Sequence, residues 1–296
     1  MEESPAVARR RVRLALRTAR EAKGLTQTQI AEAMEWSLSK VMRIENGDVN
    51  VSVSDLRALL AYLDLTDAVV TRHLLADAKI ARRARYSLDR QYKEHLPPGL
   101  FELMQFEQEA AASRYFNAGL VPGLLQTPHY AAAIFEIYTA GLSDATIKVR
   151  HEARLERQRR LLAQPNPSEL FVILDESVLH RRVGGPDVMV DQLRFLLSLT
   201  GNERVSIRII PFSAPAPIGN LGPFCILDME GERDAILYRE RPDSDEIVRK
   251  QQEVIRHRSL MARLWSFACG PADSARLIQD RVDLISAAPS LAGEPH

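Results

Sequence analysis

A group of hydrogen-bonding side chains lies close together between residues 37 and 46. The group comprises Ser37, Ser39, Lys40, Arg43 and Asn46. Hydroxyl, amide and cationic groups donate hydrogen bonds to phosphate oxygens and to the edges of DNA bases, and a guanidinium can form two such bonds with guanine. The chemistry that these residue types predict is therefore recognition of double-stranded DNA.

Two short helices joined by a tight turn are expected to position this group. Thr26 and Ser37 are suited to cap the two helices, because a hydroxyl accepts a backbone N–H bond of the first turn. In the second helix Val41 and Ile44 recur at the spacing of a buried face, and Gly47 is of a type that favours helix ends. The outward side chains are then Ser39, Lys40, Met42 and Arg43. This pattern predicts a helix-turn-helix, which places its second helix in the major groove.

Several residues of this segment have an expected contact with DNA. Ser39, Lys40 and Arg43 are expected to face base edges. Gln27 and Asn46 are expected to hold phosphates from helix ends, where backbone dipoles also attract anions. For Leu38 the expected contact is the methyl group of thymine. The predicted DNA-contacting set is Gln27, Ser37, Leu38, Ser39, Lys40, Arg43 and Asn46.

The charge distribution supports this interpretation. The chain has 39 basic and 39 acidic residues, so its net charge is zero. Between Arg9 and Arg43, however, nine basic residues accompany only three acidic ones, which gives this segment a charge of +6. A basic segment that coincides with a helix-turn-helix is typical of a protein that contacts the DNA backbone. Taken alone, the arginines from Arg9 to Arg13 are better explained as a solvated helix face.

The same segment resembles the Cro/CI-type (XRE) family of helix-turn-helix regulators. The matching positions are Leu16-Arg17, Arg20, Gly24-Leu25-Thr26-Gln27, Ile30-Ala31, Ser37 and Ile44-Glu45-Asn46-Gly47. In that family the arginine matching Arg20 pairs with the glutamate matching Glu45 and ties the first helix to the end of the third. The resemblance therefore implies a structural ion pair between these two residues.

Composition argues against several classes of protein. No run of about 18 apolar residues is present and no apolar segment follows the basic N-terminus, so we expect neither a transmembrane helix nor a secretory signal. Cys225 and Cys269 lack a second cysteine or histidine at metal-ligand spacing. The sequence does not decide whether a disulfide joins them, but we favour the interpretation that both are reduced thiols in a cytoplasmic protein.

The length of the chain suggests two domains. We expect a helix-turn-helix domain over residues 1–80, a helical linker over 81–98, an α+β domain over 99–286 and a disordered tail over 287–296. The predicted fold class is a mainly α bundle followed by an α+β domain with a small sheet wrapped by helices. The strand order of that sheet does not follow from the pattern.

Hydrophobic spacing also predicts the individual elements. The first domain is expected to hold five helices, the first over 9–23, the fourth starting at Ser52 or Ser54, and the fifth capped by Thr66. In the second domain the predicted helices are 100–118, 129–139, 143–163, 186–199, 243–268 and 272–286. The predicted strands are 170–175, 205–210, 224–227 and 235–238.

The second domain is similar to a C-terminal domain of actinobacterial XRE-type regulators, a group that includes WhiJ-like developmental regulators. The matching segments are Val121–Thr127 with Tyr130-Ala131, Arg154-x-x-Arg157-Gln158, Leu174–Leu179, Gln192-Leu193 and Ile209–Phe212. Genes of that group often adjoin one for a small acidic-to-neutral protein, and the pair has been likened to antitoxin and toxin. The resemblance thus implies a DNA-binding regulator controlled by a partner.

Charged residues of the second domain are candidates for a ligand or partner site. Asp175 and Glu176 follow a predicted strand, where ligands bind in open sheets. Arg154 and Arg157 share a helix face with Arg150. An internal salt-bridge network is the interpretation that we favour over a ligand pocket. Motifs of hydrolases, nucleotide-binding proteins and zinc peptidases are absent, so we expect no enzyme, no cofactor and no metal.

The expected function is sequence-specific regulation of transcription by a homodimer whose second domain senses a small partner protein or a ligand. The alternative is an antitoxin-like protein whose main role is to bind the product of a neighbouring gene, with DNA binding serving autoregulation. The sequence alone does not decide between them.

Overall fold

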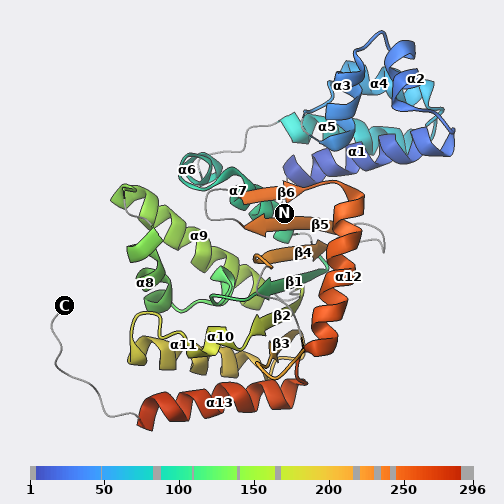
Figure 1. Cartoon of the computed structure of the whole chain (residues 1–296). Coiled ribbons are helices and arrows are strands. Elements are labelled where there is room, and N and C mark those ends of the chain that lie inside the picture. The colour runs from blue at the N-terminus through green and yellow to red at the C-terminus, as the bar shows by residue number, and fades with distance from the viewer. Residues whose placement is uncertain are drawn as a thin grey trace. The chain divides into compact units, whose positions relative to one another are not determined.

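The protein consists of two compact units (Figure 1). The first comprises Met1–Arg90 and Glu102–Glu109, and the second comprises Gln91–Phe101 and Ala110–His296. The computed structural model describes residues 5–47, 49–82, 88–108, 110–138, 141–163, 168–215, 221–229, 235–240 and 245–287.

Residues 5–82 form the helical bundle that the sequence predicts. The helices are α1 Pro5–Ala22, α2 Gln27–Ala33, α3 Leu38–Asn46, α4 Val53–Tyr62 and α5 Ala68–Arg82. Thr26, Ser37 and Ser52 cap α2, α3 and α4, because their hydroxyls accept backbone N–H groups of the first turn. Gly47 ends α3 at φ 80°, in the left-handed conformation that glycine adopts without strain.

Two helix starts in this unit differ from the expectation. Helix α1 begins at Pro5 rather than at residue 9. Helix α5 is capped by Asp67 and not by Thr66, since Oδ1 of Asp67 accepts the N–H groups of Val69 and Val70, both at 2.8 Å. A carboxylate at this position is also attracted to the positive end of the helix dipole.

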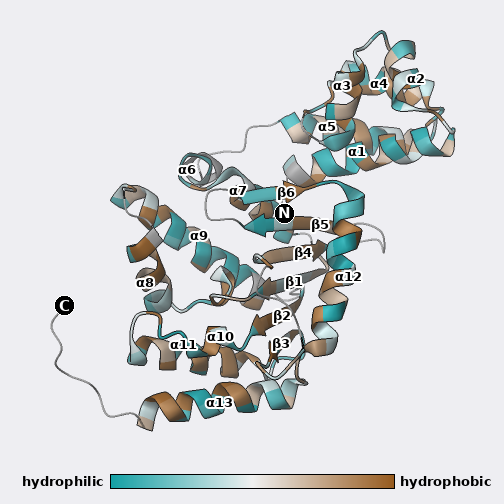
Figure 2. Ribbon diagram, in the orientation of Figure 1, coloured by the Kyte–Doolittle hydropathy of each residue, from teal (hydrophilic) through white to brown (hydrophobic). Residues whose placement is uncertain are grey.

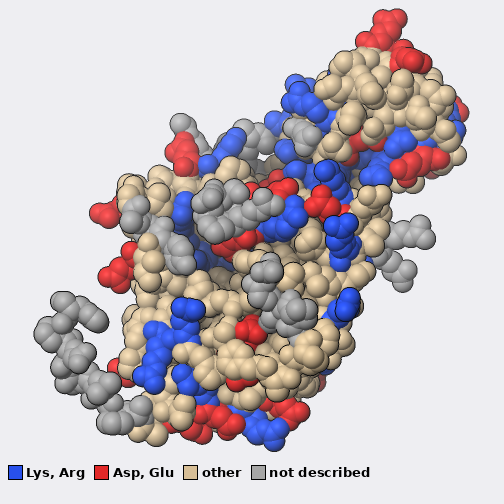
Figure 3. All heavy atoms as spheres, viewed as in Figure 1, with Lys and Arg blue, Asp and Glu red and all other residues tan. Residues whose placement is uncertain are grey.

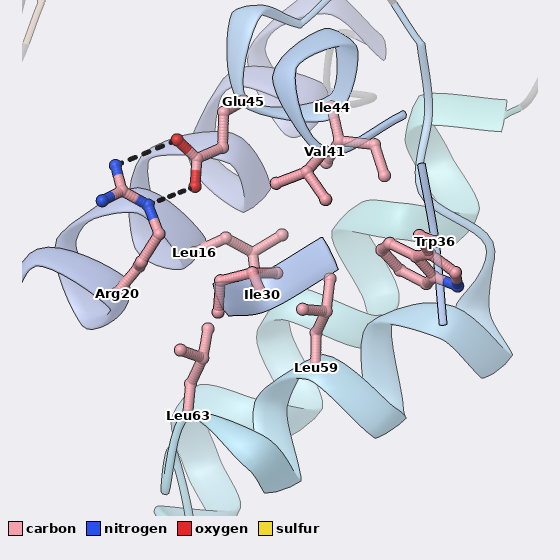
Figure 4. Close-up of a pocket in the computed structure, with 9 residues that line it drawn as sticks. All are labelled: Leu16, Arg20, Ile30, Trp36, Val41, Ile44, Glu45, Leu59 and Leu63. Carbon is pink, nitrogen blue, oxygen red and sulfur yellow. Dashed lines mark hydrogen bonds and ion pairs between the residues drawn. The ribbon is translucent and has the colours of Figure 1, made fainter. Parts of the chain in front are cut away.

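Aliphatic side chains from all five helices form the core of the first unit. Leu16 of α1, Ile30 of α2, Val41 and Ile44 of α3 and Leu59 of α4 are each at most 5% exposed. Figure 4 shows these side chains converging on one point, with Trp36 and Leu63 beside them. The packing fixes which face of α3 is buried and therefore which face remains outside.

The second unit contains a six-stranded mixed sheet, which confirms the predicted α+β class. The strand order is β3-β2-β1-β4-β5-β6. The first three strands of the chain run parallel, and β4, β5 and β6 continue antiparallel beside β1. The strands are β1 Ala112–Asn117, β2 Glu169–Asp175, β3 Val205–Ile210, β4 Phe224–Asp228, β5 Ala235–Glu240 and β6 Asp245–Val248.

Helices cover both faces of this sheet (Figure 1). On one face Phe116, Ile173 and Phe224 pack against Met261 and other residues of α12. On the other face Tyr115, the strand neighbour of Phe116, accepts a hydrogen bond from Arg157 of α9. Figure 2 shows hydrophobic residues along β2 and β4 and hydrophilic ones along much of α9. The helical segments are α8 Pro128–Tyr138, α9 Asp144–Ala163, α10 Ser177–His180, α11 Pro186–Leu199, α12 Gln251–Phe267, α13 Pro271–Ala287 and the short 3₁₀ helix η1 Gly123–Leu125.

Two predicted helices are wrong over part of their length. The helix expected over 100–118 ends at Glu107 (α7, Pro98–Glu107), and β1 follows it. The helix expected over 243–268 starts only at Gln251, after β6. In both places the backbone is paired with strands distant in sequence, β1 between β2 and β4, and β6 with β5. Non-local pairing therefore overrides the local helical spacing.

Four further expectations concern membrane-spanning helices, the two cysteines, the linker and the C-terminal tail. No described helix is long and apolar enough to cross a membrane. Cys225 is buried in β4 and Cys269 is half-buried after α12, and no disulfide joins the two. Helix α6, Leu88–His95, lies within the predicted linker. The tail expected to be disordered lies outside the described residues from 288 onward.

Candidate nucleic-acid interface

An ion pair, drawn in Figure 4, and the side-chain amide of Gln27 anchor α3 against α1 and α2. Nε and Nη2 of Arg20 donate to the two carboxylate oxygens of Glu45 at 2.6 and 3.0 Å. The side-chain amide of Gln27 donates to Oε2 of Glu45 at 2.7 Å. Glu45 is only 8% exposed, and its hydrogen bond raises the pKa of Arg20 above the ordinary value. The pairing that the resemblance implied is present, and it fixes the rotation of α3 about its axis.

Lys40, near the start of α3, is held by residues of the preceding turn and of α4. Nζ of Lys40 lies 3.6 Å from the centre of the Trp36 ring and 3.1 Å from Oδ2 of Asp55 in α4. The ammonium is attracted both to the face of the Trp36 ring and to the carboxylate of Asp55, which lies in α4. Glu35 precedes Trp36 with φ 56°, a left-handed conformation that is strained for a residue with a Cβ. The turn therefore directs Lys40 away from the outer face of α3.

The outer face of α3 forms a narrow arc of five exposed side chains. At about 100° per residue, the order around the helix is Leu38, Met42, Asn46, Ser39 and Arg43. The side chain of Arg43 forms no ion pair or hydrogen bond within the described residues. Leu38 is 42% exposed and Met42 is 44% exposed. We call these five residues the α3 arc.

The structure brings most of the predicted DNA-contacting residues together, but not all of them. Ser39, Arg43 and Asn46 lie on the α3 arc with Leu38, and Ser37 borders it as the N-cap. Lys40 is engaged by Trp36 and Asp55, and the Gln27 amide is engaged by Glu45, so neither side chain extends from the arc.

Met42 lies on the arc between Leu38 and Asn46 but is absent from the predicted set. Its helical position could have identified it, because Met42 is three residues from Ser39 and four from Asn46 and Leu38. Residue type misled the prediction, since only hydrogen-bonding side chains and Leu38 were given a role.

In the folded protein, acidic residues outside the basic segment offset part of its positive charge. Among the ion pairs between described residues, four join a cation of this segment to an acid that follows Arg43 in the chain. These pairs are Arg11–Asp77, Arg20–Glu45, Lys23–Asp64 and Lys40–Asp55. Figure 3 accordingly shows acidic and basic side chains interspersed on the visible face of the first unit. The case for DNA binding thus rests on the α3 arc more than on the charge of the segment.

The charged residues singled out in the second unit do not form one site. Asp175 is on the same sheet face as Ile173, which packs against α12, whereas Arg154 and Arg157 project from α9 above the opposite face. Asp175 accepts the backbone N–H of Ser177 at 2.9 Å. Glu176 accepts the N–H of Phe212 at 2.7 Å and lies 3.2 Å from the ring of His180. The sheet thus separates Asp175 from Arg157, and Glu176 is engaged by the backbone of Phe212 and by His180.

Arg154 instead supports an irregular segment of buried backbone, Val121–Thr127. Nη1 of Arg154 donates to the side-chain oxygen of Gln126 at 2.6 Å, and its guanidinium stacks 4.5 Å from the Phe135 ring. Burial is the main cause that lowers the pKa of Arg154 to about 10, and the like charge of Arg157 adds to it.

Three glutamines complete the support of this segment. Gln126 donates to the carbonyl of Val121, and Gln158 donates to the carbonyls of Leu124 and Gln126. Gln192, which is fully buried, accepts the N–H of Thr127 at 2.7 Å and donates to the carbonyl of Leu125 at 2.8 Å. Backbone outside helices and strands can be buried only when its polar groups are satisfied in this way. We call these three glutamines the glutamine network.

Comparison with known proteins agrees with the division into two units. Residues 12–74 match a helix-turn-helix domain, which indicates DNA binding. Residues 100–280 match a domain of unknown function, DUF5753. No curated protein and no solved structure matches the chain. Because this second match extends over more than half of the chain, the protein belongs to the DUF5753 family.

Proposed function

We propose that this protein is a sequence-specific DNA-binding regulator of transcription. The observation that carries the proposal is the α3 arc, an exposed helix face with the guanidinium of Arg43 available at one side. The Arg20–Glu45 pair and the aliphatic core hold this face rigidly, and preorganised side chains lose less entropy when they bind. Arg43 is assigned a bidentate contact with guanine, and Ser39 and Asn46 are assigned to neighbouring base edges and phosphates.

The proposal includes a homodimer. One helix in a major groove contacts only a few base pairs, and helix-turn-helix proteins gain affinity by pairing two such helices about one DNA turn apart. Light scattering of the free protein and of its DNA complex gives the stoichiometry. A protected DNA segment with two related half-sites is the expected footprint, and a single half-site bound by one chain would overturn the dimer.

The second unit is assigned a regulatory role, in which a partner protein or a ligand changes the affinity of the first unit for DNA. The support for this assignment is that the unit has its own sheet, its own core and a family match separate from the helix-turn-helix. Purification of the full chain from its native cells, followed by mass spectrometry and DNA titration with and without the bound component, tests the role. An affinity that is the same in both states would contradict it.

The experiment that tests DNA recognition begins with selection from a random duplex library by the full chain. Fluorescence anisotropy of the enriched duplex then compares wild type with Arg43→Ala. The variant should lose about 1–3 kcal/mol of binding free energy and the preference at one base pair. Arg72→Ala on α5 removes an equal charge from another exposed helix face and is the matched control. If Arg43→Ala weakens binding equally on every duplex, Arg43 contacts only phosphate. If the selection enriches no sequence, the protein does not bind DNA sequence-specifically.

A further inference from the structure

Two apolar side chains occupy one side of the α3 arc. Leu38 and Met42 are one helical turn apart, and each exposes more than two fifths of its surface. Neither belongs to the buried core of the first unit, to which α3 contributes Val41 and Ile44. We call Leu38 and Met42 the apolar ridge. Exposed apolar groups gain free energy when they are removed from water, so this ridge favours a partner with apolar surface.

The position of the ridge restricts what that partner can be. Met42 is adjacent on the arc to Asn46, and Ser39 and Arg43 follow. A helix that enters the major groove with Arg43 against a guanine also brings Met42 to the base edges. The major groove offers one prominent apolar group on its bases, the methyl at C5 of thymine, and 5-methylcytosine carries the same group.

We propose that the apolar ridge reads the 5-methyl group of a pyrimidine, with Met42 as the main contact and Leu38 as its neighbour. The inference rests on the proposed DNA-binding function and adds a specificity-determining residue to it. Asn46 and Ser39 separate Met42 from Arg43 around the helix, so we assign the methyl group and the guanine to different base pairs. The flexible thioether side chain of methionine adapts to a methyl group without a fixed hydrogen-bond geometry.

The first test changes only the DNA. In the duplex enriched by selection, each thymine is replaced in turn by deoxyuridine, which lacks the methyl group and keeps every hydrogen-bonding atom. Separate duplexes carry 5-methylcytosine at each cytosine and so distinguish the two sources of the methyl group. Loss of one buried methyl contact should weaken binding about fourfold, which corresponds to ~0.8 kcal/mol. A gain of the same size at one methylated cytosine also supports the proposal.

The second test combines these duplexes with variants. Met42→Ala should bind the parent duplex more weakly and lose the difference between thymine and uracil at the sensitive position. Val69→Ala on α5 shortens a side chain that is 57% exposed outside α3 and should keep the full methyl effect. Circular dichroism of each variant checks its folding.

The outcomes separate the methyl contact from DNA binding itself. The protein could bind a specific sequence with an affinity that does not change with uracil, with methylcytosine or with substitution of Met42. That result would overturn the methyl contact but would not contradict the proposed function. A methyl effect that persists unchanged in Met42→Ala and in Leu38→Ala would place the contact elsewhere and overturn the proposal. Absence of any enriched duplex would overturn the proposed function and this inference together.

Discussion

Polar side chains act differently in the two units of this protein. In the first unit Arg20, Gln27 and Glu45 hold a helix from within, and the neighbouring residues on the outer face of that helix remain accessible. In the second unit Arg154 and the glutamine network turn inward and bind backbone groups of one irregular segment. The first arrangement leaves a surface that can bind something else, whereas the second uses its polar groups internally.

This difference shows that a recurring motif need not be a binding site. Val121–Thr127, Gln158 and Gln192 carry the resemblance to a known domain, and the structure explains all three by the hydrogen bonds that bury the segment. Within the part of the chain that the structure describes, the side chains of Ser39 and Asn46 are exposed and make no such hydrogen bonds. Substitutions in each unit can test this difference.

Of the substitutions considered, Glu45→Ala should lower the free energy of unfolding of the first unit the most. Removing the carboxylate leaves the guanidinium of Arg20 and the amide of Gln27 without their acceptor, and breaking a buried ion pair costs about 3–5 kcal/mol. The two tryptophans allow each unit to be followed separately, because Trp36 belongs to the first unit and Trp265 to the second. Urea unfolding is therefore monitored through Trp36 in a Trp265→Phe background. Glu32→Ala, at an exposed position of α2, is the control, and an equal loss in both variants would contradict the structural role of Glu45.

Gln192→Ala should destabilise the second unit by about 2–3 kcal/mol, because the Thr127 N–H and the Leu125 carbonyl lose their partner while buried. Unfolding is monitored through Trp265 in a Trp36→Phe background. The affinity of the intact chain for DNA should not change under conditions where both units are folded. Gln279→Ala, which removes an exposed glutamine from α13, should have little effect. Altered DNA affinity in the folded Gln192 variant would break the contrast between the units.

Asp55→Ala should strengthen DNA binding. The substitution releases Lys40 and removes a negative charge beside α3, so affinity should rise by about 0.5–1 kcal/mol and the salt dependence should steepen by roughly one released counterion. In a Lys40→Met background the same substitution should gain less. If both backgrounds gain equally, the released ammonium is not the cause.

Glu35→Gly should stabilise the first unit by about 0.5–1 kcal/mol, because glycine relieves the left-handed strain at φ 56° but loses more entropy on folding. Thermal unfolding followed through Trp36 measures the change. Gly47→Ala, at a site with φ 80°, should have the opposite sign. Destabilisation by Glu35→Gly would mean that the glutamate side chain contributes more than the strain costs.

The parts of the structure that could be predicted are those set by neighbouring residues. Thr26, Ser37 and Gly47 act within one helical turn, so their types alone place α2 and α3. Strand β1 was missed because its pairing partners begin at residues 169 and 224. The direction of Lys40 depends on Asp55, fifteen residues later, and the burial of Thr127 depends on Gln192. These relations have no local signal in the sequence.

Whether Arg43 on the α3 arc contacts a guanine, as we propose, can be measured with one double-mutant cycle. Wild type and Arg43→Ala are titrated against the selected duplex and against duplexes in which 7-deazaguanine, which lacks the N7 acceptor, replaces each guanine in turn. Arg43→Ala should weaken binding to the parent duplex by about 1–3 kcal/mol and should have far less effect on the duplex altered at one guanine. An equal loss on every duplex would show that Arg43 does not read a guanine and would contradict the claim.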